Sequence, residues 1–198
     1  MSESRHARKR PRSLRIIAGT WRGRRLVFPA GTQVRPTPDR ARETLFNWLC
    51  ERVDGALCLD LFAGSGILGM EALSRGAREV WFVERDRALA AAIAAHAETL
   101  NAAAQVVVDD AERFLERAAG RRFDIVFLDP PYAVPLEPYV ARLPACSSPA
   151  ALVYVERSAR SGLPRDPLLV WQKTSRAGGV CYGLATMARA DPRQDDHS

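Results

Sequence analysis

From residue 57 onward, short apolar runs alternate with longer segments whose apolar residues recur at helical spacing. The strand-like runs are Leu57–Phe62, Val80–Val83, Gln105–Val108, Phe123–Leu128 and Ala151–Val155, and the helical segments between them are Ile67–Arg75, Arg87–Leu100, Ala111–Ala119 and Pro138–Leu143. Continuous apolar runs between helices indicate strands that are buried on both faces. This alternation requires right-handed crossovers and predicts an α/β fold in which helices cover both faces of a mostly parallel sheet.

The pattern changes at both ends of the chain. Leu168–Thr174 and Val180–Met187 flank a turn that contains Gly178 and Gly179. Two such runs around a glycine turn predict an antiparallel hairpin, which would close a seven-stranded sheet. Near the N-terminus, Leu14–Ile17 and Leu26–Phe28 flank a second turn-rich stretch and predict a separate, small hairpin.

A helix is predicted between this small hairpin and the first parallel strand, from about Asp39 to Val53. Thr37 is a suitable N-cap, and Pro38 suits the first helical position because proline has no amide hydrogen to satisfy there. One face of the helix is mostly apolar, and its members are Ala41, Leu45, Trp48, Leu49 and Arg52.

These elements divide the chain into four parts. We expect a basic, disordered arm over residues 1–13, a hairpin extension over 14–35, the α/β domain over 36–190 and a flexible tail over 191–198. The total of 198 residues is enough to bury one substantial hydrophobic core.

The charge of the chain is concentrated at its N-terminus. Residues 1–25 contain nine basic side chains and one acid, so this segment carries +8 and the other residues together carry −2, since the total is +6. A basic segment attached to a nearly neutral body predicts a polyanionic partner, because each neutralised phosphate releases condensed counterions. The candidate contacts to such a partner are Arg15, Arg22, Arg24, Arg25, Arg35 and Arg40.

Several other classes of protein do not fit the composition. No run of residues approaches the roughly 18 apolar positions that a membrane span needs, and the charged first residues do not form a secretory signal. The four cysteines are scattered without a CxxC pair, which argues against a zinc site or a disulfide framework. We therefore expect a cytoplasmic protein that binds neither metal nor membrane, and we expect it to be a monomer.

A glycine-rich loop follows the first parallel strand. Residues 64–69 match the pattern G-x-G-x-x-G, and Glu84 lies 20 residues beyond Gly64. Such a loop turns tightly, lets a ligand approach the backbone, and presents the amides that open the next helix. As written this is the dinucleotide fingerprint, although glycine turns also serve helix–strand packing alone.

Acidic residues at the ends of three successive strands favour S-adenosylmethionine over a dinucleotide. Asp60 stands directly before the glycine loop, where it would repel a pyrophosphate and attract an α-ammonium group. Glu84 can bind both hydroxyls of a ribose, and Asp110 can accept a hydrogen bond from an adenine amine. Each acid alone could be a solvated charge at a strand end, but together they indicate a cofactor site.

The most specific motif is Asp129-Pro130-Pro131-Tyr132, which follows the apolar run Phe123–Leu128. The two prolines restrict the backbone and hold their neighbours in a fixed geometry. A carboxylate and the Pro130 carbonyl could accept both hydrogens of an exocyclic base amine and so localise its lone pair for attack on a methyl group. Tyr132 could stack on the base. An ordinary proline turn with a core tyrosine is the alternative interpretation.

These residues resemble those of a known family, the bacterial 16S ribosomal RNA guanine-N2 methyltransferases that modify guanine-966. The shared residues span about Leu14 to Ala188. Apart from the glycine loop and the proline motif they form three groups. The first comprises residues 15–19 and 22–24, the second residues 35–37, 39–40, 42–43 and 45–47, and the third residues 71–77. The resemblance implies a Rossmann-like methyltransferase fold, S-adenosylmethionine as methyl donor with S-adenosylhomocysteine as product, and one guanine amine of the assembling small ribosomal subunit as acceptor.

The resemblance also implies roles for individual residues. It assigns Asp60 and Gly64 to the methionine part of the cofactor, Glu84 to the ribose, Asp110 and Ala111 to the adenine, and residues 129–132 to the target base. The complete predicted cofactor site is Asp60, Phe62, Gly64, Gly66, Glu84, Asp110 and Ala111, and the predicted catalytic residues are Asp129, Pro130, Pro131 and Tyr132.

Other functions remain open from the residues alone. Nothing in the proline motif separates guanine N2 from adenine N6, so N6-adenine methylation of DNA or RNA is the nearest alternative. Glutamine methylation of a protein fits the basic segment less well, and an NAD-dependent dehydrogenase leaves the proline motif without a role. A non-catalytic RNA-binding assembly factor is the alternative from another class, and the intact Asp60, Asp129 and Tyr132 argue against it.

Overall fold

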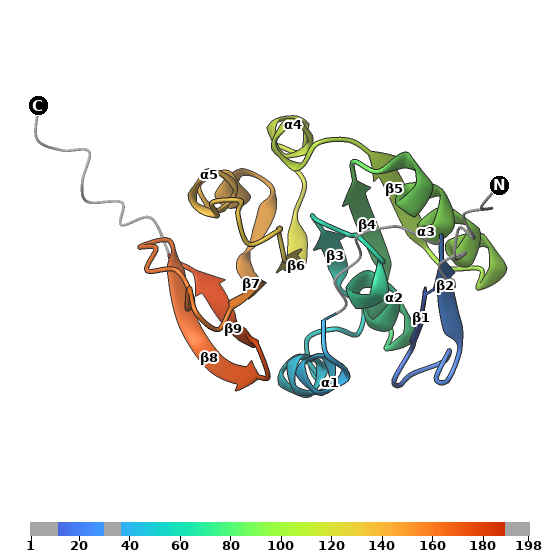
Figure 1. Cartoon of the computed structure of the whole chain (residues 1–198). Helices are drawn as coiled ribbons and strands as arrows, with labels where there is room; N and C mark the ends of the chain where they lie inside the picture. Colours follow the sequence, from blue (N-terminus) through green and yellow to red (C-terminus); the bar gives the residue numbers. More distant parts are fainter. Residues whose placement is uncertain (1–11, 30–36, 189–198) are drawn as a thin grey trace, which may run out of the picture.

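The computed structural model describes residues 12–29 and 37–188. In this part of the chain a seven-stranded sheet has the order β5-β4-β3-β6-β7-β9-β8 (Figure 1). The strands are β3 (Leu57–Asp60), β4 (Glu79–Glu84), β5 (Ala104–Val108), β6 (Phe123–Leu128), β7 (Ser147–Ser158), β8 (Leu169–Ala177) and β9 (Val180–Met187). The first five are parallel, while β9 runs antiparallel to both β7 and β8. The predicted parallel sheet with a closing antiparallel hairpin is confirmed.

Helices cover both faces of this sheet, as the alternating pattern predicts. They are α1 (Asp39–Trp48), α2 (Ile67–Ser74), α3 (Arg87–Thr99), α4 (Ala111–Arg117) and α5 (Glu137–Val140), and a 3₁₀ turn, η1, spans Leu143–Ala145. The apolar residues of α1, α2 and α3 share one core with Ile125 and Phe127 of β6. Those of α4 and α5 share a second core with Val126 of the same strand. Successive residues of β6 therefore face opposite layers.

Helix α1 begins at Asp39 as predicted, but its N-cap and its C-terminal end differ from the prediction. Its N-cap is Pro38 rather than Thr37, and no side chain caps it. The helix ends at Trp48, and Leu49 is its C-cap, so the predicted continuation to Val53 is wrong. Arg52 lies in the following turn, where it is exposed and donates a hydrogen bond to the Ala150 carbonyl, and it is not part of the buried face.

The small N-terminal hairpin pairs β1 (Arg12–Arg15) with β2 (Arg25–Phe28) and lies beside α2 and α3 (Figure 1). Its turn docks tightly on the end of α2. A Cβ at Gly19 would lie 1.8 Å from the Ser74 carbonyl oxygen, and Gly19 has a φ of +81°. The Thr20 amide donates to that same oxygen at 2.7 Å, and the Ser74 hydroxyl donates to the Ala18 carbonyl at 2.6 Å. Glycine is therefore required where the hairpin meets the helix.

A buried carboxylate on α2 anchors the hairpin through hydrogen bonds to its backbone. The two oxygens of Glu71 accept hydrogen bonds from the Ile17 amide at 2.7 Å and the Ala18 amide at 3.0 Å. Glu71 also pairs with Arg75 at 2.8 Å, and the fully buried Arg42 of α1 lies 3.7 Å from it. Arg42 donates in turn to the Arg15 carbonyl at 3.0 Å. This cluster joins α1, α2 and the hairpin, and it explains why residues from three separate segments belong to one sequence signature.

Candidate active site

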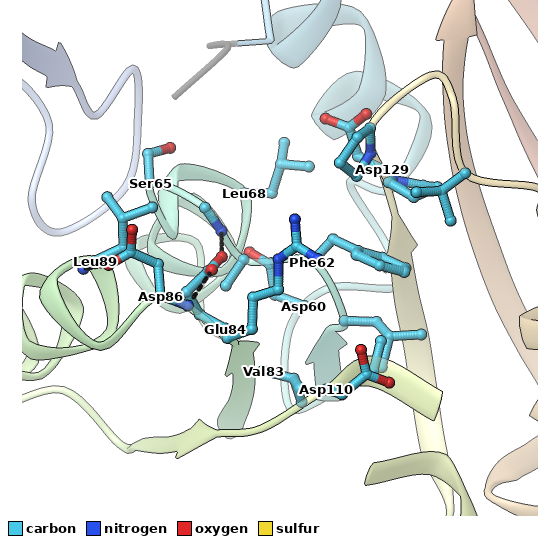
Figure 2. Close-up of a pocket in the computed structure, with 18 of the residues that line it drawn as sticks. Asp60, Phe62, Ser65, Leu68, Val83, Glu84, Asp86, Leu89, Asp110 and Asp129 are labelled. Atoms are coloured by element: carbon cyan, nitrogen blue, oxygen red, sulfur yellow. Dashed lines mark hydrogen bonds between the residues drawn. The ribbon is translucent and has the colours of Figure 1, made fainter. Parts of the chain in front are cut away.

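The carboxyl ends of β3, β4, β5 and β6 surround a cavity of about 430 Å³. Asp60, Glu84, Asp110 and Asp129 each follow or end one of these strands, and all four line this cavity (Figure 2). Gly64 of the glycine loop and Tyr132 of the proline motif line the same cavity. Neighbouring parallel strands end at one edge of the sheet, which is where ligands bind in open α/β folds. The structure thus brings the two sequence motifs together.

Glycine is needed at positions 64, 66 and 69 for different structural reasons. Gly64 and Gly66 have φ values of +51° and +68°, a conformation that favours glycine. A Cβ at Gly66 would lie 3.0 Å from Ile93 Cγ1 of α3, and one at Gly69 would lie 2.3 Å from Phe82 Cε1 of β4, so these glycines allow close packing against a helix and a strand. A Cβ at Gly64 would meet no protein atom closer than 3.8 Å, and this glycine borders the cavity. Of these three glycines, Gly64 is the one that lines the cavity, where the absence of a side chain leaves room for a ligand beside the backbone.

Asp60 is almost fully buried at the start of this loop. Its Oδ2 atom accepts a hydrogen bond from the Gly69 amide at 3.1 Å. Burial raises the pKa of Asp60 from 3.8 to about 8, the Gly69 hydrogen bond opposes this rise, and the nearby Glu84 carboxylate adds to it. A carboxylate that is difficult to ionise alone is stabilised by a cation, so this end of the cavity suits a ligand ammonium group.

Backbone amides orient the next two carboxylates. Glu84 Oε2 accepts from the Gly64 amide at 2.7 Å and Oε1 accepts from the Asp86 amide at 2.8 Å (Figure 2). Asp110 is the N-cap of α4, where its Oδ1 accepts from the Glu112 amide at 2.9 Å. Carboxylate oxygens have several lone pairs, so these groups keep acceptor capacity for hydroxyls and amines of a ligand.

Two aromatic side chains provide an apolar wall beside Asp110. Phe62 and Tyr139 pack edge to face, with their ring centroids 5.0 Å apart, and both line the cavity. The pKa of Tyr139 is raised by burial and then by the Asp110 carboxylate, so the phenol lies within the field of that acid. A planar ring with an amine donor, such as adenine, matches this combination of surface and acceptor.

The proline motif forms the opposite part of the cavity wall. Asp129 through Tyr132 all line it, together with Val134, whose amide donates to the Pro131 carbonyl at 2.8 Å. Behind them on β7, the Tyr154 hydroxyl donates to Glu156 Oε2 at 2.9 Å. The pKa of Tyr154 is raised well above its usual range by burial and by the carboxylates of Glu156 and Asp129.

The predicted site residues are distributed as follows. Every predicted cofactor residue except Gly66 lines the cavity, and Gly66 lies behind the wall as the N-cap of α2. The predicted RNA contacts in the described part of the chain are all exposed, namely Arg15, Arg22, Arg24, Arg25 and Arg40. Arg35 and the basic residues before Arg12 lie outside the described residues.

Sequence reasoning missed several residues of this region. Thr37, interpreted as a helix cap, is buried and lines the cavity. Arg85 and Asp86 also line it, and their position directly after Glu84 at the end of β4 was a usable signal. Tyr139 had no such signal, because its place depends on how α5 packs.

The described residues contain no group of three or more histidine, cysteine or acidic side chains placed to hold a metal ion. Across residues 12–29 and 37–188, no helix has the length and apolar character to cross a membrane.

Comparison with known proteins gives one consistent family. The family described as conserved hypothetical protein 95 matches residues 14–185. Ribosomal RNA small subunit methyltransferase D of Escherichia coli K12 is 44% identical over 177 residues, which are 86% of this chain and 88% of that protein. The solved structure of the Escherichia coli protein yhhF has a TM-score of 0.80 at 43% identity, and the match covers 88% of this chain and 98% of that one.

A more distant structure was solved with bound ligands. The Thermus thermophilus 16S rRNA N2 G1207 methyltransferase, in complex with S-adenosylmethionine and guanosine, has a TM-score of 0.67 at 25% identity. The similarity covers 90% of this chain and 50% of that one.

Proposed function

The chain belongs to the family described as conserved hypothetical protein 95, and on this premise we propose that it methylates the exocyclic N2 of a guanine in 16S ribosomal RNA. S-adenosylmethionine is the methyl donor, and guanine-966 is the target that the sequence resemblance suggests. The relatives' activity on small-subunit RNA and the guanosine complex of the Thermus protein support this assignment.

One observation carries the proposal: the glycine loop and the proline motif line one cavity. Its residues fit S-adenosylmethionine in three places. Asp60 is a buried acid that an ammonium group would stabilise, Glu84 is an oriented acceptor for ribose hydroxyls, and Asp110 lies beside an aromatic wall suited to adenine. The open space beside Gly64 allows the ligand to approach the backbone.

The chemistry assigned to the protein is positioning and electrostatic stabilisation. When bound, S-adenosylmethionine would supply an electrophilic methyl group and would leave as S-adenosylhomocysteine. The Asp129 carboxylate and the Pro130 carbonyl accept the two N–H bonds of the guanine amine, which localises the nitrogen lone pair for in-line attack. As the nitrogen gains its methyl group it must lose a proton, and Asp129 is the base that accepts it. Tyr132 stacks on the base, a contact typically worth about 1–3 kcal/mol.

RNA binding is assigned to the N-terminal hairpin. Its exposed arginines carry the excess positive charge, and the Glu71 cluster holds the hairpin against the helix that begins at the glycine loop. We assign the protein to the cytoplasm, acting on the small ribosomal subunit or its assembly intermediate. A monomer suffices, because all of the proposed groups come from one chain.

Transfer of a tritiated methyl group tests this proposal. Labelled S-adenosylmethionine would be incubated with the protein and with small ribosomal subunits, protein-free 16S RNA or DNA, and the product digested to nucleosides. The expected product is N2-methylguanosine from subunits or from 16S RNA. Labelled N6-methyladenine, in RNA or DNA, would support the alternative base, and absence of any label would support the non-catalytic assembly factor.

A further inference from the structure

One arginine fastens the turn that carries Tyr132. Arg157, near the end of β7, donates from Nη2 to the Tyr132 carbonyl at 2.8 Å and from Nη1 to the Val134 carbonyl at 3.1 Å. The carbon of its guanidinium group lies 6.0 Å from the centre of the Tyr132 ring. The same side chain thus contacts both the backbone and the ring of the base-stacking residue.

The sheet register explains how this contact arises. Leu128 of β6 pairs with Val155 of β7, so Arg157 lies two residues beyond the last pair, next to the point where the proline motif leaves the sheet. A guanidinium group has donors in a rigid planar fork, so one arginine can bind two carbonyls at once. A lysine at the same place would bring a point charge without that geometry.

The contact matters because both tethered residues belong to the cavity wall. Tyr132 and Val134 line the cavity, while Arg157 is not among the residues that line it. Within the turn, the Val134 amide bonds to the Pro131 carbonyl, and Arg157 adds two anchors from a different strand. We infer that Arg157 is a positioning residue, which holds Tyr132 in the orientation that stacks on the target base.

This inference rests on the proposed function, and it has one direct competitor: a cation that binds an RNA phosphate. Arg176 of β8 provides a matched control for charge. Both Arg157 and Arg176 pair with Cys181 of β9, one from each side, so they end at the same edge of the sheet. Arg176 is exposed, and no hydrogen bond joins it to the turn in the described part of the chain.

The first experiment measures Arg157→Met and Arg176→Met beside wild type. Arg157→Met should lower the rate of methyl transfer at saturating cofactor by roughly 10- to 100-fold, because displacement of a positioning group has effects of that order. Its affinity for S-adenosylhomocysteine should equal that of wild type, which also verifies folding. Arg176→Met should transfer at the wild-type rate. Equal losses in both variants would show that Arg157 acts only as a charge and would overturn the inference.

Hydrogen exchange gives a readout that does not depend on activity. A peptide covering residues 131–136 should exchange faster in Arg157→Met than in Arg176→Met. Arg157→Lys should give intermediate exchange and an intermediate rate, because it keeps the charge but loses the fork. This milder variant decides the question if Arg157→Met does not fold, and a wild-type rate and exchange in Arg157→Lys would count against the inference.

A double-mutant cycle then identifies the residue through which Arg157 acts. If Arg157 works by orienting Tyr132, adding Arg157→Met to Tyr132→Ala should lower the rate by no more than about twofold, because the two losses are not independent. Fully additive losses would reject the positioning role. The proposed function and this inference fail on different results. The proposed function fails if wild type labels no guanine. This inference fails if wild type is active and Arg157→Met transfers methyl groups at the same rate.

Discussion

The backbone amide of Gly64 donates a 2.7 Å hydrogen bond to Glu84 Oε2. This bond ties the glycine turn after β3 to the end of β4, and the second oxygen of Glu84 holds the Asp86 amide at the start of α3. One carboxylate therefore orders two loops that line the cavity where we propose that the cofactor binds. Contacts within the protein itself thus organise this part of the site.

Replacing Glu84 by glutamine should weaken cofactor binding. The amide side chain keeps one acceptor, but its NH₂ group would face a backbone donor, so one loop loses its anchor. We expect S-adenosylhomocysteine to bind roughly 10- to 100-fold more weakly by calorimetry, the range of one hydrogen bond to a charged group. Glu98→Gln, on the exposed side of α3, should bind like wild type. Unchanged affinity in Glu84→Gln would remove Glu84 from the site.

Cofactor affinity should depend on pH through Asp60. The pKa of Asp60 is about 8 in the folded protein, so the side chain is mostly protonated at pH 6, and binding of an ammonium group must displace that proton. Affinity for S-adenosylhomocysteine should rise by up to about tenfold per pH unit between pH 6 and 8. Asp60→Asn should bind more weakly and show a flat profile. A wild-type profile without slope would contradict the ammonium assignment.

Asp60 should also make the stability of the ligand-free protein depend on pH, in the direction opposite to cofactor affinity. A folded pKa raised from 3.8 to about 8 means that the native state holds the proton more tightly, so its stabilising effect is complete below pH 3.8 and is lost as pH rises toward 8. The free energy of unfolding of Asp60→Asn, measured without ligand relative to wild type, should therefore be higher at pH 8 than at pH 5. Urea unfolding at the two pH values measures this difference, and equal shifts at both would argue against a buried, protonated Asp60.

The hairpin arginines should determine the salt dependence of RNA binding. Substitution of Arg22, Arg24 and Arg25 by glutamine removes three exposed charges. The slope of log affinity against log salt should fall by about 0.7–0.9 for each arginine that contacts a phosphate. Fluorescence anisotropy with a 16S RNA fragment measures the slope. The same substitution at the exposed Arg113, Arg122 and Arg165 is the control, and an equal loss of slope in both triple variants would exclude a specific role for the hairpin.

Glu71 should be important for stability rather than for chemistry. Glu71→Ala deprives the Ile17 and Ala18 amides of their acceptor, and it leaves the fully buried Arg42 with Asp39 as its one remaining carboxylate in the described part of the chain. Breaking a buried charge pair typically costs about 3–5 kcal/mol. Urea unfolding should show a loss of this size, whereas Glu116→Ala on the exposed side of α4 should change little. A loss below about 1 kcal/mol, the usual value for a surface pair, would contradict the structural role.

The parts of the structure that could be predicted from sequence follow from local rules. Alternating apolar runs defined the parallel sheet, and acids at the ends of successive strands were expected to meet because those ends share one edge. The burial of Arg42 could not be predicted, because its neighbours Asp39 and Glu43 suggest a solvent-exposed helix face. Its buried partner, Glu71, lies 29 positions away in the sequence. Thr37 was misinterpreted for a similar reason, since a threonine before a proline has the local signature of a cap.

The most direct test of the central claim is single-turnover methyl transfer by Asp129→Asn at saturating S-adenosylmethionine. Asp129 lines the same cavity as Gly64. Because we propose that Asp129 contacts the target base and not the cofactor, its change should leave cofactor affinity near the wild-type value. Asparagine cannot take up the proton that the amine loses, and it is a weaker hydrogen-bond acceptor for the amine. We therefore expect transfer to slow by about 100- to 10,000-fold. A transfer rate within about tenfold of wild type would show that this carboxylate does not act on the target amine.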